Sequence, residues 1–155
     1  MSGGRDGLAG LCAADGEFML LARHWTGVLR LGFGPGGAGQ AADGAGGAHG
    51  TLDLRLEGGR PVEAADAPDG PLADEPGLVG LAAPAELWDR ILAPVPAPFC
   101  NDVVPAQALG LVRSGHELTF WQYYPAIRRL VELLRTERAG ATGAAGAATV
   151  GSGGR

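Results

Sequence analysis

The sequence contains no lysine, and all 12 of its cationic side chains are arginines. Without lysine the chain has no Schiff-base lysine, no phosphate-loop lysine and no serine–lysine pair. The formal net charge is −5 and no basic run is present. Nucleic-acid binding depends on cations that neutralise phosphates, so this charge balance argues against a DNA- or RNA-binding protein.

Cysteine and long hydrophobic runs are also scarce. Cys12 and Cys100 are the only cysteines, and two unpatterned cysteines are typical of reduced, intracellular thiols. No run approaches the roughly 18 apolar residues of a membrane span, and residues 1–11 lack the hydrophobic segment of a signal peptide. We therefore expect no integral membrane segment and a cytoplasmic location.

Glycine and proline are abundant, with 28 and 11 residues, and half of the glycines fall within residues 34–50 and 139–155. Segments of that composition have little apolar surface to bury. We predict a flexible loop over residues 34–50, a disordered tail over residues 139–155 and a flexible leader over residues 1–15. The remaining 16–138 are long enough for one domain.

The first half of this domain has the patterns of strands. Residues 51–57 alternate leucine with charged residues, which is typical of a half-buried antiparallel strand. Residues 25–33 predict a strand that turns Leu29 and Leu31 to one face and Arg30 to the other. Gly58-Gly59 predicts a tight hairpin turn. The other predicted strands are residues 60–65, 78–82 and 111–113.

Four segments have the spacing or caps of helices: residues 17–24, 85–92, 101–109 and 114–137. Ser114-x-x-Glu117 has the form of a capping box at the start of the last helix, and Pro125 should kink or split that helix. The last helix has an apolar stripe made of Trp121, Tyr124, Ile127, Leu130, Val131 and Leu134. This order predicts an α+β fold, a mainly antiparallel five-stranded sheet with helices packed on one face.

The element order resembles that of the sterol carrier protein 2-like (SCP2-like) lipid-binding family. The matching stretches are WTGVLRLGF, TLDLRLEGGRPVEAADAPD, PAELWDRIL and LGLVRSGHELTFWQYYPAIRRLVELLR, which lie within residues 17–137. The resemblance implies a tunnel between sheet and helices that holds a fatty acyl chain, a sterol or a similar lipid, and no catalysis by the chain itself. Two departures are a long, proline-rich segment 70–77 and His116, which stands where the family often has aspartate.

A ligand in that space would contact apolar side chains of the sheet and of the later helices. The candidate ligand-binding residues are Leu29, Leu31, Leu54, Leu56, Trp88, Ile91, Phe99, Val103, Phe120, Trp121, Tyr124 and Ile127. Each of them could equally be plain core, since large apolar side chains are mostly inside. We expect no cofactor and no metal, because His24, His49 and His116 are not clustered as metal ligands are.

Two other functions remain open at the level of sequence. The chain could be a non-enzymatic accessory subunit of the same fold, without a ligand and with a partner enzyme. A small acid–base enzyme would use Tyr123, Tyr124, His116 or Asp102, and we expect this less than a binding role. Cys100, just before a helix, could be a reactive thiol, although a buried inert thiol is the commoner case.

Overall fold

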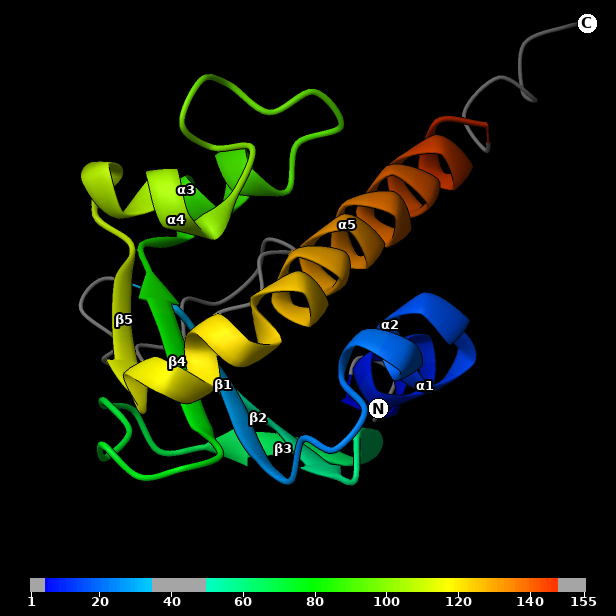
Figure 1. The fold of residues 1–155 in the computed structure, drawn as a ribbon. Helices are drawn as coiled ribbons and strands as arrows, with labels where there is room; N and C mark the ends of the chain where they lie inside the picture. Colours follow the sequence, from blue (N-terminus) through cyan, green and yellow to red (C-terminus); the bar gives the residue numbers. More distant parts are fainter. Residues whose placement is uncertain (1–4, 35–49, 148–155) are drawn as a thin grey trace, which may run out of the picture.

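The computed structural model describes residues 5–34 and 50–147, which form one five-stranded sheet with helices on one face (Figure 1). The strand order is β3-β2-β1-β4-β5. Neighbouring strands are antiparallel except β1 and β4, which are parallel. The predicted fold class is confirmed. The strands are β1 (Gly27–Phe33), β2 (Gly50–Glu57), β3 (Arg60–Ala67), β4 (Leu78–Ala83) and β5 (Val112–Gly115).

The leucine alternation of β2 sets the two faces of the sheet. Leu54 and Leu56 are fully buried towards the helices, and Leu54 pairs with Leu29 of β1. The hairpin to β3 turns at Gly58 and Gly59, which have φ of 57° and 82°, as a type I′ turn requires. A Cβ on Gly59 would also lie 2.6 Å from the Ala22 carbonyl oxygen, so only glycine fits there.

The helices cover the leucine face of the sheet. Figure 1 shows α5 crossing the sheet diagonally, with α1 and α2 on one side of it and α3 and α4 on the other. The helix bounds are α1 (Arg5–Ala14), α2 (Gly16–Leu21), α3 (Ala85–Ile91), α4 (Val103–Ala106) and α5 (Glu117–Ala147), and a short 3₁₀ turn, η2 (Gln107–Leu109), follows α4. Among the described helices, none has the length and hydropathy needed to cross a membrane.

The prediction of a flexible leader is wrong for residues 5–14, which form α1. Leu8 and Cys12 are spaced four residues apart and are buried in the core, so this helix has an apolar face despite its glycines. The helix packs against β3, α2 and α5. Its burial makes it part of the domain.

The prediction of a disordered tail is wrong for residues 139–147. The last helix continues to Ala147 and passes through Pro125 without being split. Alanine has the highest helix propensity, and it offsets the glycines of this stretch. Residues 148–155, and residues 35–49 of the predicted Gly/Ala loop, lie outside the described residues.

The predicted capping box at Ser114 is also wrong, because Ser114 and Gly115 belong to β5. His116 does the capping instead: its Nδ1 accepts a hydrogen bond from the Thr119 backbone N–H at 3.2 Å. Gly115, with φ of 86°, makes the sharp turn between strand and helix. The histidine therefore supplies the side-chain acceptor that an aspartate would supply at this position.

Candidate functional site

A pocket of about 320 Å³ lies on the outer face of the sheet, away from the helices. Successive residues of a strand point to opposite faces, so Gly32, Gly80 and Ala82 face outward where their neighbours Leu31 and Leu81 face the core. The strands thus present almost no side chain at the centre of this face. The lining residues are Arg30, Gly32, Gly34, Thr51, Gly70, Pro71, Gly80, Leu81, Ala82, Ala83, Pro84, Gly110, Val112 and Ser114.

Close contacts around these small residues fix the shape of the pocket floor. A Cβ on Gly80 would lie 2.2 Å from the Ser114 Oγ, and a Cβ on Gly32 would lie 3.2 Å from the Ala82 Cβ. The Ser114 Oγ also accepts a hydrogen bond from the Leu72 N–H at 3.1 Å. That bond ties the segment between β3 and β4 to β5, so it forms one side of the pocket.

One end of the pocket is polar. The Nε and Nη2 of Arg30 each donate to a carboxylate oxygen of Asp53 at 2.7 Å. Its Nη1 donates to the Gly70 carbonyl oxygen at 3.4 Å, and the Thr51 hydroxyl donates to Asp69. The hydrogen bond to Asp53 raises the pKa of Arg30. Partial burial lowers this pKa, and the negative charges of Asp53 and Asp69 raise it further.

The rest of the lining is apolar or backbone, contributed by small and hydrophobic residues such as Pro71, Leu81, Pro84 and Val112. Apolar pockets with a few fixed polar groups are the usual form of small-molecule sites. In chemical terms the pocket can hold an apolar group, with the Ser114 hydroxyl and the Arg30–Asp53 pair at its edges.

None of the predicted ligand-binding residues lines this pocket, and most of them lie in the layer between sheet and helices. Most are packed core. Nine are at most 2% exposed: Leu29, Leu31, Leu54, Leu56, Trp88, Ile91, Val103, Phe120 and Ile127. The Trp88 indole N–H donates to the Gly32 carbonyl oxygen at 2.8 Å, so α3 is fixed against β1. Their contact with a ligand stays a prediction, and the observed role of these nine side chains is packing.

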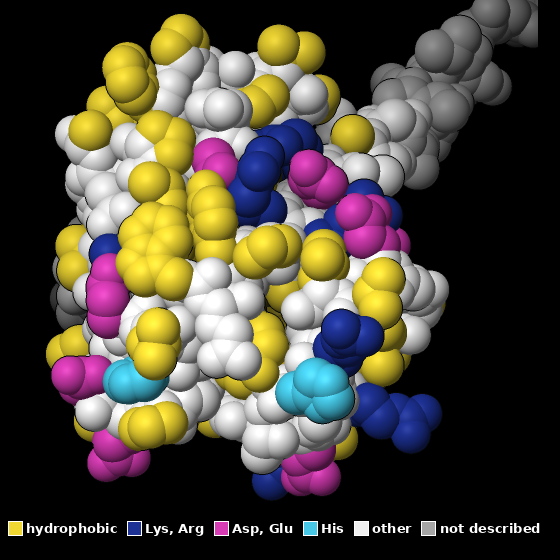
Figure 2. All heavy atoms as spheres, viewed as in Figure 1, with side chains coloured by type: hydrophobic (Ala, Val, Ile, Leu, Met, Phe, Trp, Pro, Cys, Tyr) yellow, Lys and Arg dark blue, Asp and Glu magenta, His cyan; other side chains and the backbone are white. Residues whose placement is uncertain are grey.

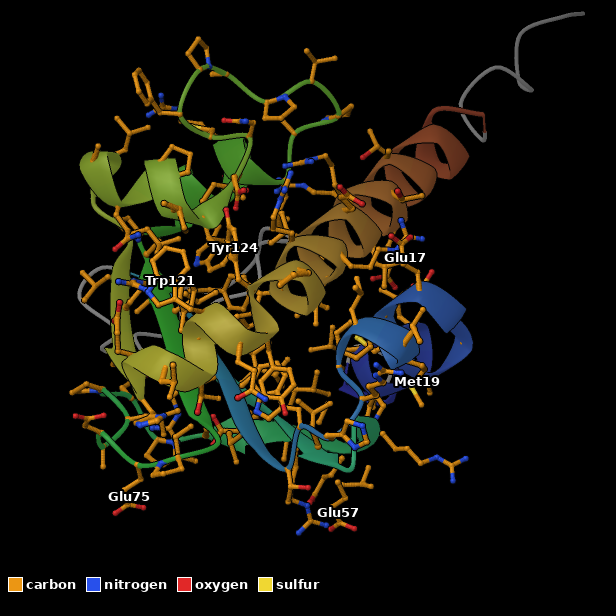
Figure 3. All side chains as sticks on the ribbon, in the orientation of Figure 1. Glu17, Met19, Glu57, Glu75, Trp121 and Tyr124 are labelled. Carbon is orange, nitrogen blue, oxygen red and sulfur yellow. The ribbon has the colours of Figure 1, made fainter. Side chains whose placement is uncertain are left out.

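Phe99, Trp121 and Tyr124 are not part of that packed core. Phe99 is 59% exposed and Trp121 is 47% exposed, so the predicted inward position of Trp121 is wrong. The helix turns Phe120 and Tyr123 inward instead, and Tyr123 stacks on Trp25 with ring centroids 4.8 Å apart. Figure 3 shows Trp121 and Tyr124 on α5 near α4.

Hydrophobic side chains gather at the surface near the start of α5 (Figure 2). Two exposed side chains of this helix end are Trp121, at 47%, and Leu118, at 70%. The Arg113 guanidinium lies over the Phe120 ring, 4.2 Å from its centroid, and 5.2 Å from the Trp121 centroid.

Two of the four candidate acid–base residues meet. The Tyr124 hydroxyl donates to Asp102, and Arg128 Nε lies 3.0 Å from the same carboxylate oxygen. Asp102 also caps α4 through the Val103 N–H. Partial burial and the hydrogen bond to Asp102 raise the pKa of Tyr124 to about 12, and the hollow beside Asp102 and Arg128 measures only about 10 Å³.

Thiols and histidines of the described residues form no group of metal ligands: residues 5–34 and 50–147 hold no cluster of three or more His, Cys, Asp or Glu. Cys12 and Cys100 are both buried. Burial, with smaller effects from Asp15 and Glu137, raises the pKa of the Cys12 thiol to about 12. His49 lies outside the described residues.

Comparison with solved structures places this arrangement of strands and helices among known folds. A crystal structure of sterol carrier protein 2 superposes with a TM-score of 0.57 and 17% identity, covering 84% of this chain and 92% of that one. The fold is that of sterol carrier protein 2. This confirms the resemblance seen in the sequence at the level of fold.

A second neighbour gives the same answer. A conserved hypothetical protein from Thermus thermophilus, whose description suggests a sterol carrier protein, superposes with a TM-score of 0.55 and 22% identity, covering 84% of this chain and 86% of that one. No family model and no curated protein matches the chain. At these identities the likeness extends to the fold alone.

The outer pocket is absent from the sequence-based prediction, although a signal for it exists. In LRLGF and in VGLAA, large apolar residues alternate with Arg30 and Gly32 or with Gly80 and Ala82. The large residues of this alternation indicate the buried face of the sheet. The residues between them lie on the outer face, where most of them are small. Two central strands with glycine or alanine facing outward indicate a hollow there.

Proposed function

We propose that this chain binds and carries an apolar small molecule, such as a fatty acyl chain or a sterol, in the pocket over Gly32, Gly80 and Ala82. The pocket itself carries the proposal. Its volume of about 320 Å³ falls within the roughly 300–1,000 Å³ range of small-ligand sites, and its lining is mostly apolar. The neighbour described as sterol carrier protein 2 has a name that fits such a role.

The proposed location differs from the tunnel between sheet and helices that the sequence resemblance implied. The reason is packing: the side chains of that layer are nearly all closed to solvent, and close-packed interiors leave little room for a ligand. The outer face, in contrast, has open volume above β1, β4 and β5.

We also propose that the chain is not an enzyme. The Tyr124–Asp102 pair adjoins a hollow too small for a substrate, and the raised pKa of Tyr124 makes its hydroxyl a weak acid near neutral pH. His116 is occupied in capping α5. These partners account for Tyr124, Asp102 and His116, and the fourth candidate, Tyr123, stacks on Trp25.

Binding can be tested with parinaryl alcohol, a polyene whose fluorescence rises in apolar surroundings. We expect saturable binding to the full chain, and we expect lipid in organic extracts of the purified protein by mass spectrometry. Absence of both results would contradict the binding function. The accessory-subunit alternative would then be favoured, and a fixed partner protein that co-purifies would support it.

The location is tested by filling the pocket. Ala82→Leu adds a side chain that projects from β4 into the open volume, and we expect at least a tenfold loss of probe affinity. Ala65→Leu is the matched control. Ala65 lies on β3, opposite Asp53 of β2, and it does not line the pocket. If both variants bound the probe as the original chain does, the pocket would not be the binding site.

A further inference from the structure

The polar end of the pocket determines which charge a ligand can have there. Among the lining residues that the structure describes, Arg30 is the one cationic side chain, and it would be the natural partner for the carboxylate of a fatty acid. Whether it can serve that role depends on which of its N–H groups are already used.

The guanidinium already donates to three oxygens of the chain. Nε and Nη2 make the parallel pair of hydrogen bonds to Asp53, each at 2.7 Å, which is the geometry that a ligand carboxylate would need. The Arg30 and Asp53 side chains are 14% and 25% exposed. Nη1 points at the Gly70 carbonyl oxygen, so three of the five guanidinium N–H bonds already have acceptors in the chain.

The charge at this end is also balanced by more than one carboxylate. Besides Asp53, the carboxylate of Asp69 acts on Arg30 through its charge, and Asp69 accepts the Thr51 hydroxyl at the pocket wall. Two acidic groups therefore stand beside one guanidinium. A carboxylate placed here would lose its hydration and meet like charges beside a guanidinium that is already paired with Asp53.

Ser114, a third polar lining residue beside Arg30 and Thr51, can serve an uncharged oxygen. The Ser114 Oγ accepts the Leu72 N–H, which leaves the hydroxyl proton to donate to an alcohol, ester or ketone oxygen. A neutral hydroxyl is a weaker partner for an anion than a charged donor is. The wall at β5 therefore suits a neutral head group.

We propose that the pocket selects uncharged apolar ligands, such as long-chain alcohols, esters or sterols, over the same chains ending in a carboxylate, because Asp53 occupies the guanidinium of Arg30. This inference rests on the proposed binding function and specifies its ligand class. It makes Asp53 a specificity-determining residue that acts through Arg30.

Two probes with the same polyene chain test the inference. At pH 7.5 we expect parinaryl alcohol to bind at least tenfold more tightly than parinaric acid, measured by fluorescence titration below the concentration at which either probe aggregates. Equal or tighter binding of the acid would overturn the inference and leave the binding function standing. If neither probe bound, the proposed function itself would fail and the inference with it.

A substitution tests the cause. Asp53→Asn removes the competing carboxylate charge, and we expect it to tighten binding of parinaric acid several-fold while the affinity for the alcohol changes less than twofold. Asp74→Asn is the matched control: it makes the same change of net charge at an exposed residue that does not line the pocket, and the acid affinity should not change. Tighter acid binding in both variants, or in neither, would contradict the role of Asp53.

The inference can still be tested if Asp53→Asn does not fold. Far-ultraviolet circular dichroism checks the fold of each variant first, and Asp69→Asn offers a second way to reduce the acidic charge near Arg30. Loss of either carboxylate should reduce the ratio of the affinity for parinaryl alcohol to the affinity for parinaric acid. If this affinity ratio were unchanged in every folded variant, the electrostatic explanation would be overturned.

Discussion

Arg129 of α5 binds Asp15 through two hydrogen bonds, Nε to Oδ1 at 3.1 Å and Nη2 to Oδ2 at 2.7 Å, across 114 positions of sequence. The same Asp15 caps α2 by accepting the Phe18 N–H at 2.7 Å. The hydrogen bond from Arg129, followed by the one from Phe18, lowers the pKa of Asp15. One carboxylate thus fixes the start of α2 to the middle of α5.

This pair predicts a pH-dependent stability. A lowered pKa in the folded state means that the Asp15 carboxylate stabilises the fold above its unfolded pKa, near 3.8, and that this stabilisation is lost as pH falls through the folded value. Asp15→Asn keeps a capping oxygen but loses the charge. We expect the original chain to be more stable than the variant at pH 7 in urea unfolding, with the difference shrinking below pH 4.

The matched control for this experiment is Asp74→Asn, an exposed aspartate outside α1, α2 and α5. Its effect on the free energy of unfolding should be small at pH 7. A difference between the original chain and Asp15→Asn that stayed constant down to pH 2.5 would show that the charge of Asp15 contributes nothing to the fold.

The fold could be predicted from the sequence wherever the pattern was periodic. The leucine alternation around Leu54 located β2, and the Gly58-Gly59 turn fixed the hairpin to β3. Arg30 was expected on the face opposite Leu29 and Leu31, and that is where it lies. Period and turn chemistry are local properties, so one sequence is enough to read them.

The failures have a different physical origin. Residues 5–14 and 139–147 looked like loose tails because glycine and alanine have small side chains, yet alanine favours helix and two well-spaced residues, Leu8 and Cys12, are enough to dock α1. The position of Trp121 depended on which of two adjacent aromatics turned inward. That choice is made by the partner surface, here Trp25 stacked on Tyr123, which the local pattern does not contain.

The candidate site, like the fold, could be predicted only in part from the sequence. The sequence predicted an apolar ligand, and the structure holds an apolar pocket, but on the opposite face of the sheet from the predicted residues. A packed layer and a ligand tunnel need the same kind of side chains, so composition alone does not separate them. The hollow comes from side chains that are missing at Gly32 and Gly80, together with the β1–β4 pairing that brings their strands together.

Trp88 and Trp121 should respond very differently to the same substitution. Trp88→Phe removes the buried hydrogen bond from the indole N–H to the Gly32 carbonyl oxygen, now 2.8 Å long, and leaves a smaller side chain in the core. The lost hydrogen bond costs about 0.5–1.5 kcal/mol, and the cavity adds to that cost. Trp121→Phe changes a half-exposed side chain, for which a shift within about 0.5 kcal/mol is typical. Chemical denaturation of both variants measures the contrast, and equal effects would contradict the assignment of Trp88 to the core.

Both cysteines should be unreactive in the folded protein. Cys12 is fully buried and burial raises its pKa to about 12, so the thiol stays protonated at pH 8, whereas the thiolate is the reactive form. Cys100 is equally buried. We expect a maleimide to label neither residue in the native state and both in urea, with Cys12→Ser and Cys100→Ser each removing one label. Fast native labelling lost only in Cys100→Ser would instead identify Cys100 as a reactive thiol.

Gly80 and Ser114 should be coupled in a double-mutant cycle. Gly80→Ala places a Cβ 2.2 Å from the Ser114 Oγ, and such overpacking costs about 1–3 kcal/mol. Ser114→Ala removes the acceptor of the Leu72 N–H, worth about 1 kcal/mol. In the double variant the overlap disappears, since the new Cβ would lie 3.5 Å from the Ser114 Cβ. We therefore expect the double variant to be less destabilised than the sum of the single variants, by about 0.5 kcal/mol or more. Strict additivity in urea unfolding would mean that β4 and β5 move apart to accept the alanine, and that the floor of the pocket is softer than its contacts imply.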